Sequence, residues 1–165
     1  VLVDVGCGNG HFCLSLAKKG FECIYGMDYS ASAVQLATAL AQKEDVSSVR
    51  YTSGDLLNPS TISALEADVI IDKGTFDAIC LGSVEPLPDN FTSKTDYFAH
   101  NYVQSVKKMS KTTHTFIITS CNWTEDELCR LFSKEGYTRV GSISHPSFAF
   151  GGSSGSTVST VIFRS

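Results

Sequence analysis

The sequence predicts an α/β fold in which helices cover both faces of a seven-stranded, mostly parallel sheet with one antiparallel strand near the C-terminus. Three observations lead to this fold class. Short apolar, β-branched runs alternate with segments of helical periodicity along most of the chain. A glycine-rich turn follows the first apolar run directly. The last two runs have no helix between them and are joined by the loop FGGSSGS, so we expect an antiparallel pair there.

Each expected element has a local signal. Strands are expected where short apolar runs stand between turn residues, at residues 1–5, 23–28, 48–53, 68–72, 114–120, 138–144 and 157–163. Helices are expected where apolar residues recur every three or four positions, at residues 10–19, 30–43, 59–66, 95–110 and 124–135. Ser30 precedes the second helix as an N-cap residue, and Thr124 with Glu127 forms a capping box before the last one.

Size and charge limit the class of protein. The chain has 165 residues, of which 42% are hydrophobic and 18% charged, which suits one domain over residues 1–165. Because the chain opens inside its first strand, we expect this domain to be truncated at its N-terminus. The formal net charge is -4, and no long basic run is present, so we expect neither nucleic acid nor an anionic membrane as partner. We expect a monomer.

The cysteines and the apolar segments indicate a cytoplasmic protein. Six cysteines occur without the close Cys or Cys/His spacing of a metal site. We therefore expect buried, reduced thiols and no bound metal. No apolar stretch approaches the ~20 residues that a membrane-spanning helix needs.

The turn after the first expected strand has the pattern of a ligand-binding loop. Gly6, Gly8 and Gly10 stand at every second position, and Asp4 precedes them by two residues. Glycines allow sharp turns and leave room for a ligand close to the backbone. Dinucleotide sites space their glycines differently, and a carboxylate at Asp4 would repel a pyrophosphate. The same carboxylate suits a ligand that carries an ammonium and a sulfonium group.

The next two expected strands also end in acidic residues. Asp28 closes the second strand at the distance expected for a carboxylate that accepts hydrogen bonds from both ribose hydroxyls, and Tyr29 follows it. Asp55 follows the third strand, where it suits an adenine amino group, and the Leu56 backbone suits a ring nitrogen. Tyr29 would lie against the adenine face. Ligands of open α/β sheets bind at these strand ends, so the matches support one another.

With these motifs the chain resembles the seven-stranded S-adenosylmethionine-dependent methyltransferases, whose fold is Rossmann-like. The resemblance covers essentially all 165 residues. It implies S-adenosylmethionine as cofactor, with the glycine loop under the methionine chain and Asp28 on the ribose. Tyr29, Asp55 and Leu56 are then expected at the adenine.

The fourth expected strand indicates what is methylated. It ends in DKGTFDA at residues 72–78, where methyltransferases of planar nitrogen substrates carry an Asn/Asp-Pro-Pro-aromatic motif. DKGTFDA is similar to a lysine methyltransferase group that acts on elongation factor 1-alpha. ITSCNWTEDEL and FAFGGSSGS are further stretches similar to that group. The resemblance implies a protein-lysine N-methyltransferase with elongation factor 1-alpha as partner.

In this interpretation Asp72 and Phe76 are the catalytic residues. The Asp72 carboxylate would hold and aim the incoming lysine amine, and the Phe76 ring would face the cation as methyl groups accumulate. The alternative is that Asp72 and Asp77 cap a short helix and that Lys73 is a solvated neighbour. For the whole protein, the alternatives are methylation of a small molecule or of another residue type, and an inactive cofactor-binding scaffold.

Overall fold

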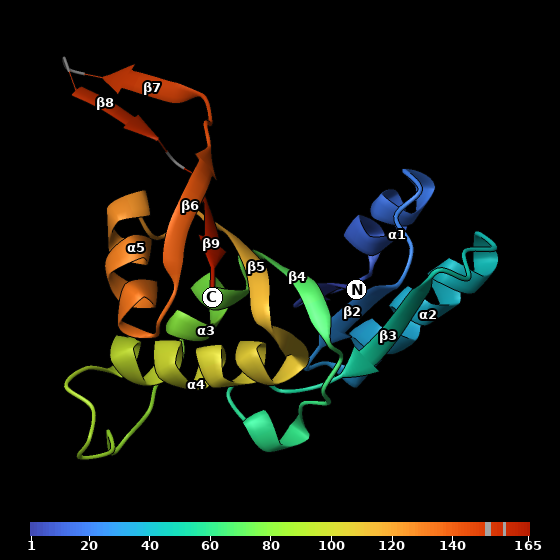
Figure 1. Cartoon of the computed structure of the whole chain (residues 1–165), viewed down its shortest axis with the longest axis horizontal. Coiled ribbons are helices and arrows are strands. Elements are labelled where there is room, and N and C mark those ends of the chain that lie inside the picture. Colours follow the sequence, from blue (N-terminus) through green and yellow to red (C-terminus); the bar gives the residue numbers. More distant parts are fainter. Residues whose placement is uncertain (151–152, 157) are drawn as a thin grey trace.

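The structure is a computed structural model that describes the backbone of residues 1–150, 153–156 and 158–165 and the side chains of residues 1–146 and 158–165. Its main sheet has seven strands in the order β3-β2-β1-β4-β5-β9-β6 (Figure 1). These are β1 (Leu2–Val5), β2 (Ile24–Asp28), β3 (Val49–Ser53), β4 (Ala67–Lys73), β5 (Ser110–Ser120), β6 (Thr138–Ile143) and β9 (Ser159–Arg164). Strand β9 runs antiparallel to β5 and β6, and the other described pairs of this sheet are parallel. The predicted seven-stranded sheet with one reversed strand is confirmed.

Helices lie on both faces of this sheet, as the sequence predicts. They are α1 (His11–Lys18), α2 (Ala31–Lys43), α3 (Thr75–Cys80), α4 (Lys94–Met109) and α5 (Glu125–Lys134). Cys13 of α1 contacts Asp4, and Tyr102 of α4 contacts Asp72. Asp72 is paired with Val5 rather than with Asp4, and neighbouring residues of a strand point to opposite faces. Helices α1 and α4 therefore cover opposite faces.

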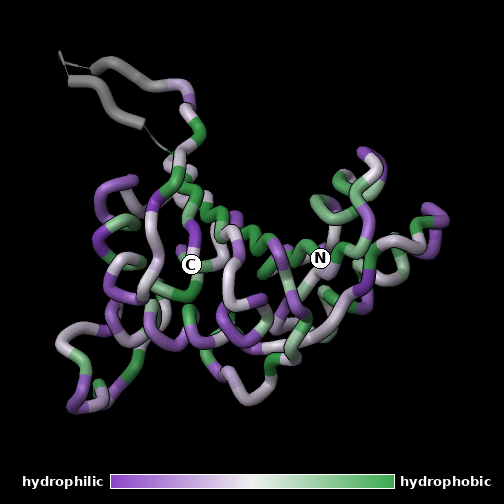
Figure 2. Tube along the Cα trace, in the orientation of Figure 1, coloured by the Kyte–Doolittle hydropathy of each residue, from purple (hydrophilic) through white to green (hydrophobic). Residues whose placement is uncertain are grey.

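The core lies mainly between the sheet and helices α4 and α5. Figure 2 shows hydrophobic residues along the central strands and hydrophilic residues on much of the outer surface. A group of fully buried aromatic rings from several elements fills this side of the sheet, namely Phe76, Tyr102, Phe116, Phe132 and Phe163. Packing of these rings fixes the positions of α3 and α4 against the sheet. Among the described residues, no helix has the length and apolar character that crossing a membrane requires.

The predicted helix at residues 59–66 is wrong. Only a 3-10 turn, Pro59–Thr61, forms there, and Ile62 is already extended, with φ -89° and ψ 129°. Ile62 is buried in the core, and Glu66 turns the chain into β4 with a positive φ of 52°. Burial of Ile62 outweighs the weak helical periodicity of this segment.

Two further boundaries differ from the prediction. Strand β5 begins at Ser110 rather than near residue 114, because its first residue pairs with Ala67 of β4. The segment between β6 and β9, predicted as a loop, carries a small antiparallel sheet of β7 (Ser147–Phe150) and β8 (Ser153–Ser156). The side chains of the stretch FAFGGSSGS lie outside the described residues.

Candidate active site

The glycine loop after β1 has left-handed backbone at all three predicted glycines. The φ angles of Gly6, Gly8 and Gly10 are 71°, 53° and 75°. A Cβ on Gly6 would lie 1.9 Å from Thr75 Oγ1, and one on Gly10 would lie 2.4 Å from the Tyr51 hydroxyl oxygen. The need for glycine at these two positions therefore comes from the protein's own packing, and not only from a ligand as the sequence suggests. At Gly8 an added Cβ would meet no described atom within 4 Å.

This difference gives a matched pair of substitutions. Gly6→Ala is expected to destabilise the fold by about 2 to 3 kcal/mol, because overpacking against Thr75 adds to the backbone strain. Gly8→Ala is expected to cost only the backbone strain, about 1 kcal/mol. Urea denaturation of both variants measures these losses. Equal losses in the two variants would contradict the role of the Thr75 contact.

Asp28 at the end of β2 fastens the glycine loop to the next strand. Its carboxylate accepts hydrogen bonds from the Gly8 N–H, at 2.8 Å, and from the Ser30 N–H, at 2.9 Å. Ser30 in turn caps α2 by accepting from the Ala33 N–H, as predicted. Since each carboxylate oxygen has two acceptor positions, Asp28 still has capacity for two further donors. Tyr29 next to it is 82% exposed.

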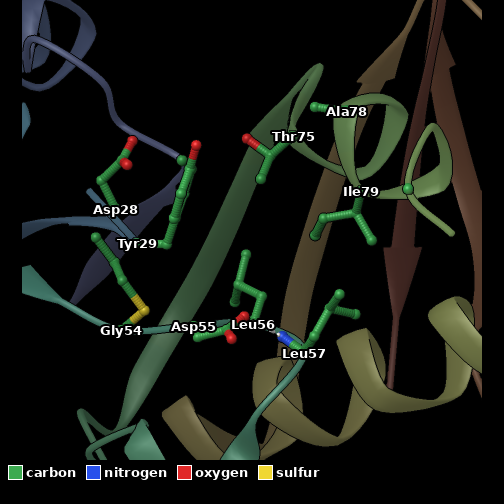
Figure 3. Close-up of a pocket in the computed structure, with 12 residues that line it drawn as sticks. Asp28, Tyr29, Gly54, Asp55, Leu56, Leu57, Thr75, Ala78 and Ile79 are labelled. Atoms are coloured by element: carbon green, nitrogen blue, oxygen red, sulfur yellow. Dashed lines mark hydrogen bonds between the residues drawn. The ribbon is translucent and has the colours of Figure 1, made fainter. Parts of the chain in front are cut away.

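A cavity of about 320 Å³ lies between the ends of the first strands and α3. In Figure 3, Asp28, Tyr29 and Asp55 stand on one side of it, and Thr75 and Ile79 of α3 stand on the other. Five of the predicted residues line this cavity, namely Gly6, Asp28, Tyr29, Asp55 and Leu56. The structure thus brings together groups from three separate strand ends.

The two residues after β3 are held in place by nearby polar groups. The Asp55 carboxylate accepts from the Leu57 N–H at 2.8 Å. Ser105 of α4 donates to the Leu56 carbonyl at 2.9 Å. Within the described part of the chain, the Leu56 N–H donates to no protein acceptor. The described residues that line this cavity include Asp28 and Asp55 but neither lysine nor arginine, which disfavours a phosphate-bearing ligand.

A second cavity, of about 240 Å³, lies on the other side of the glycine loop and shares Gly6 with the first. Asp4, Asn9, His11 and Lys73 are among the residues that line it. Asp4 is 4% exposed, and its one described hydrogen bond comes from the Cys13 thiol at 3.4 Å. Burial raises the pKa of Asp4 to about 6, although the Cys13 hydrogen bond and the charge of Lys73 act in the opposite direction. The cavity therefore holds a carboxylate that lacks a strong donor.

The raised pKa of Asp4 makes stability depend on pH. Because its pKa is raised above the unfolded value of 3.8, the folded state binds more protons than the unfolded state between about pH 4 and pH 6. Stability present at low pH is therefore lost as the pH rises through this window. Asp4→Asn removes this titration. The free energy of unfolding of the variant minus that of the unsubstituted chain should therefore be larger at pH 7 than at pH 4, by up to about 3 kcal/mol. Urea denaturation without ligand at both pH values tests this, and a constant difference would contradict it.

Asp72 lies at the end of β4 but faces α4. It is fully buried, and its carboxylate accepts from the Thr75 N–H at 2.9 Å, the Phe76 N–H at 3.0 Å and the Tyr102 hydroxyl at 2.6 Å. Burial raises the pKa of Asp72 to about 7, against the effect of these hydrogen bonds. Asp72 thus caps the start of α3, as the structural alternative describes for this residue, and ties it to α4.

Phe76 and Asp77 are likewise engaged with the protein itself. Phe76 is fully buried, with its ring centroid 5.2 Å from that of Tyr102 and 5.3 Å from that of Phe132. Asp77 accepts from the Ser120 hydroxyl at 2.6 Å and the Cys121 N–H at 2.8 Å. Neither Asp72 nor Phe76 is among the described residues that line the two cavities.

Sequence reasoning missed the wall that α3 adds to the first cavity. Thr75, Ala78 and Ile79 of α3 line it, as does Gly82 just beyond this helix, and the Thr75 hydroxyl donates to the Val5 carbonyl at 2.8 Å. This wall could have been predicted, because ligands of open α/β sheets bind at strand ends and α3 begins two residues after β4.

The described residues contain no cluster of His, Cys, Asp and Glu that could hold a metal ion. All six cysteines are free, but Cys23 and Cys121 are exposed. The prediction of buried thiols is therefore wrong for these two, which lie in the turns before β2 and after β5. It is confirmed for Cys7 and Cys13, whereas Cys80 and Cys129 are only partly buried.

Comparison with known proteins places this site in a family. A family described as methyltransferase domain matches residues 1–149. The chain belongs to the methyltransferase domain family. The chain is 43% identical over 164 residues to EEF1A lysine methyltransferase 2 of Homo sapiens, covering 99% of this chain and 64% of that protein. The chain is also 34% identical over 172 residues to Protein-lysine N-methyltransferase efm4 of Schizosaccharomyces pombe, and this match covers 99% of this chain and 68% of that protein.

A solved structure shares the fold of this chain. A SAM dependent methyltransferase from Aquifex aeolicus superposes with a TM-score of 0.70 at 16% identity, covering 99% of this chain and 80% of that one. The predicted resemblance to seven-stranded methyltransferases is confirmed. The likeness to the group that acts on elongation factor 1-alpha is confirmed as well, because the human relative carries that name. This chain spans less than two thirds of the human protein's length.

Proposed function

We propose that this protein is an S-adenosylmethionine-dependent protein-lysine N-methyltransferase whose substrate is elongation factor 1-alpha. The observation that carries the proposal is 43% identity, over 99% of this chain, to a human protein named for that activity. The site supports it, because five residues that the motifs predict line the cavity at the strand ends. We further propose that the protein is a cytoplasmic monomer.

The residues at the site fit S-adenosylmethionine. Asp28 has acceptor capacity for the two ribose hydroxyls, and the free Leu56 N–H with the Asp55 carboxylate suits the adenine edge. The carboxylates around the loop suit a cation. The described residues that line the first cavity include no lysine or arginine that could pair with a pyrophosphate. When bound, this cofactor supplies a methyl group on a positively charged sulfur, which makes the methyl electrophilic.

The protein's own residues must then prepare the lysine. A lysine ammonium has no free electron pair, and removing its proton near neutral pH from a pKa near 10.4 costs about 4 kcal/mol. An apolar slot lowers that cost by disfavouring the charged form. Most of the rate is expected from holding the amine in line with the methyl group, an effect worth up to ~7–11 kcal/mol, and water can accept the proton.

Asp72 and Phe76 are still proposed to contribute to the transfer step. By capping α3, Asp72 positions the helix whose Thr75 and Ile79 line the cavity. That its carboxylate also aims the amine, and that the Phe76 ring faces the cation, stay predictions.

The proposal is tested by methyl transfer from labelled S-adenosylmethionine into a cell extract, with the protein in its full natural length. We expect one labelled band, elongation factor 1-alpha, with the label on a lysine and no label from Asp28→Ala. Label on a lysine of another protein would overturn the substrate, and label only in small molecules would overturn the protein-lysine activity. Cofactor binding without any transfer would indicate a scaffold.

A further inference from the structure

Trp123 carries a buried donor without a partner in the protein. Within the described part of the chain, its indole Nε1 is the only buried side-chain nitrogen or oxygen that forms no hydrogen bond. Buried polar groups of folded proteins are nearly always paired, because an unpaired one is costly. An indole N–H can only donate, so the missing partner is an acceptor. Since the side chain as a whole is only partly buried, the ring lies where the core meets the surface.

The turn after β5 fixes the position of Trp123. The Ser120 hydroxyl accepts from the Trp123 N–H at 2.9 Å and donates to the Asp77 carboxylate of α3 at 2.6 Å. Asp77 also accepts from the Cys121 N–H at 2.8 Å. The indole packs against Phe76, with the two ring centroids 6.2 Å apart. The backbone and one side of the ring are therefore held in place, so the unpaired N–H is a feature of a well-fixed side chain.

Helix α3 lies between this turn and the first cavity. The residues of α3 that line the cavity are spaced by three and four positions and form one face of the helix. Asp77 and Leu81 are four residues apart and share a different face, since Leu81 still has helical angles, φ -76° and ψ -15°. This face meets the turn after β5 through Asp77. Leu81 is 78% exposed, and Gly82 beside it lines the cavity. A peptide that crosses the end of α3 can therefore contact Leu81 and the turn and extend into the cavity.

We propose that Trp123 and Leu81 position the protein substrate. The indole N–H of Trp123 donates to a backbone carbonyl of the segment that carries the target lysine, and Leu81 packs against an apolar side chain of that segment. A peptide backbone suits the donor because each of its residues offers a carbonyl acceptor. Trp123 is not among the described residues that line the first cavity, so the acceptor belongs to the substrate rather than to the cofactor. This inference rests on the proposed function and adds two residues to it.

The test measures methyl transfer to elongation factor 1-alpha by the full-length protein. Trp123→Phe keeps an aromatic ring against Phe76 and removes the N–H. Its KM for elongation factor 1-alpha is expected to rise about fivefold, the loss of one hydrogen bond, while kcat and the affinity for S-adenosylhomocysteine stay within twofold. Leu81→Ala, at an exposed position, should raise the same KM about threefold without loss of thermal stability. Phe21→Leu, at an exposed ring between α1 and β2, is the matched control and should leave the KM unchanged.

An NMR measurement detects the hydrogen bond itself. Trp123 is the only tryptophan of the sequence, and in the full-length protein its indole N–H resonance is assigned by its loss in Trp123→Phe. On addition of unlabelled elongation factor 1-alpha, this proton resonance should move downfield, because the proton gains an acceptor. A residue that serves packing alone would give neither this shift nor a selective rise in KM.

The outcomes separate this inference from the proposed function. If the KM is unchanged in Trp123→Phe, or if the indole resonance does not move, the assignment of Trp123 is overturned while the proposed function stands. The same holds if kcat, cofactor affinity and thermal stability of Trp123→Phe fall while its KM does not rise. If Trp123→Phe fails to fold, the KM of Leu81→Ala and the indole resonance of the unsubstituted protein decide. If the unsubstituted protein transfers no methyl group to elongation factor 1-alpha, the proposed function fails and this inference with it.

Discussion

Asp28→Ala is expected to weaken S-adenosylhomocysteine binding about 100-fold. The carboxylate is proposed to accept from both ribose hydroxyls, and hydrogen bonds to a charged group contribute about 1.5 to 3 kcal/mol each. It also holds the Gly8 N–H at 2.8 Å and the Ser30 N–H at 2.9 Å, so its loss loosens the glycine loop on which the ligand rests. Isothermal titration calorimetry measures the affinity directly.

Asp28→Asn is the matched control for this prediction. The amide keeps one acceptor oxygen in nearly the same shape, so we expect an affinity between those of the unsubstituted protein and the alanine variant. An alanine variant that is folded and binds within twofold of the unsubstituted protein would refute the ribose assignment. If only the alanine variant fails to fold, the affinity of Asp28→Asn decides the ribose assignment.

Asp72→Ala is expected to lower the free energy of unfolding by about 4 kcal/mol. The substitution leaves the Tyr102 hydroxyl and the N–H groups of Thr75 and Phe76 without their acceptor, and unpaired buried donors cost about 1 to 3 kcal/mol each. Since Thr75 lines the first cavity, cofactor affinity should fall as well. Urea denaturation and calorimetry measure the two effects.

Tyr102→Phe separates the anchoring role of Asp72 from a role in transfer. The phenylalanine keeps the ring packed against Phe76 and removes only the hydroxyl that donates to Asp72 at 2.6 Å. If Asp72 acts by anchoring α3, Tyr102→Phe should reproduce part of the loss in stability and in cofactor affinity. If Asp72 also aims the amine, the kcat of Asp72→Asn should fall much further than that of Tyr102→Phe, beyond what their losses in stability and cofactor affinity explain. Unchanged stability in Asp72→Ala would contradict the anchoring role.

The sequence predicted the cofactor end of the site well because that part follows a rule of topology. In a parallel sheet, residues that end successive strands meet at one edge, so Gly6, Asp28 and Asp55 could be placed together without knowing any contact between them. These three residues do line one cavity, and their contact with the cofactor stays a prediction. The antiparallel pairing of the last two strands of the main sheet followed from the absence of a helical pattern between them.

The environment of β4 could not be predicted in this way. The hydroxyl that donates to Asp72 belongs to Tyr102, thirty residues further along the chain. No local sequence pattern near either residue predicts this contact. The failed helix at residues 59–66 has a similar origin, since Ile62 gains more by entering the core than by continuing a helix. Such choices depend on packing between distant segments, which local periodicity does not contain.

By itself, the sequence determined the seven strands of the main sheet, the helices α1, α2, α4 and α5, the glycine turn and the acidic residues that end the first strands, because these depend on local conformation and hydrophobic periodicity. Only the tertiary structure decided how DKGTFDA is divided. The alternation along β4 sends Asp72 under α4 and Lys73 toward Asp4, and what each side chain meets there is set by elements packed on the two faces. A carboxylate is a ligand group or a structural anchor according to the donors around it, and for Asp72 those donors are the start of α3 and the Tyr102 hydroxyl.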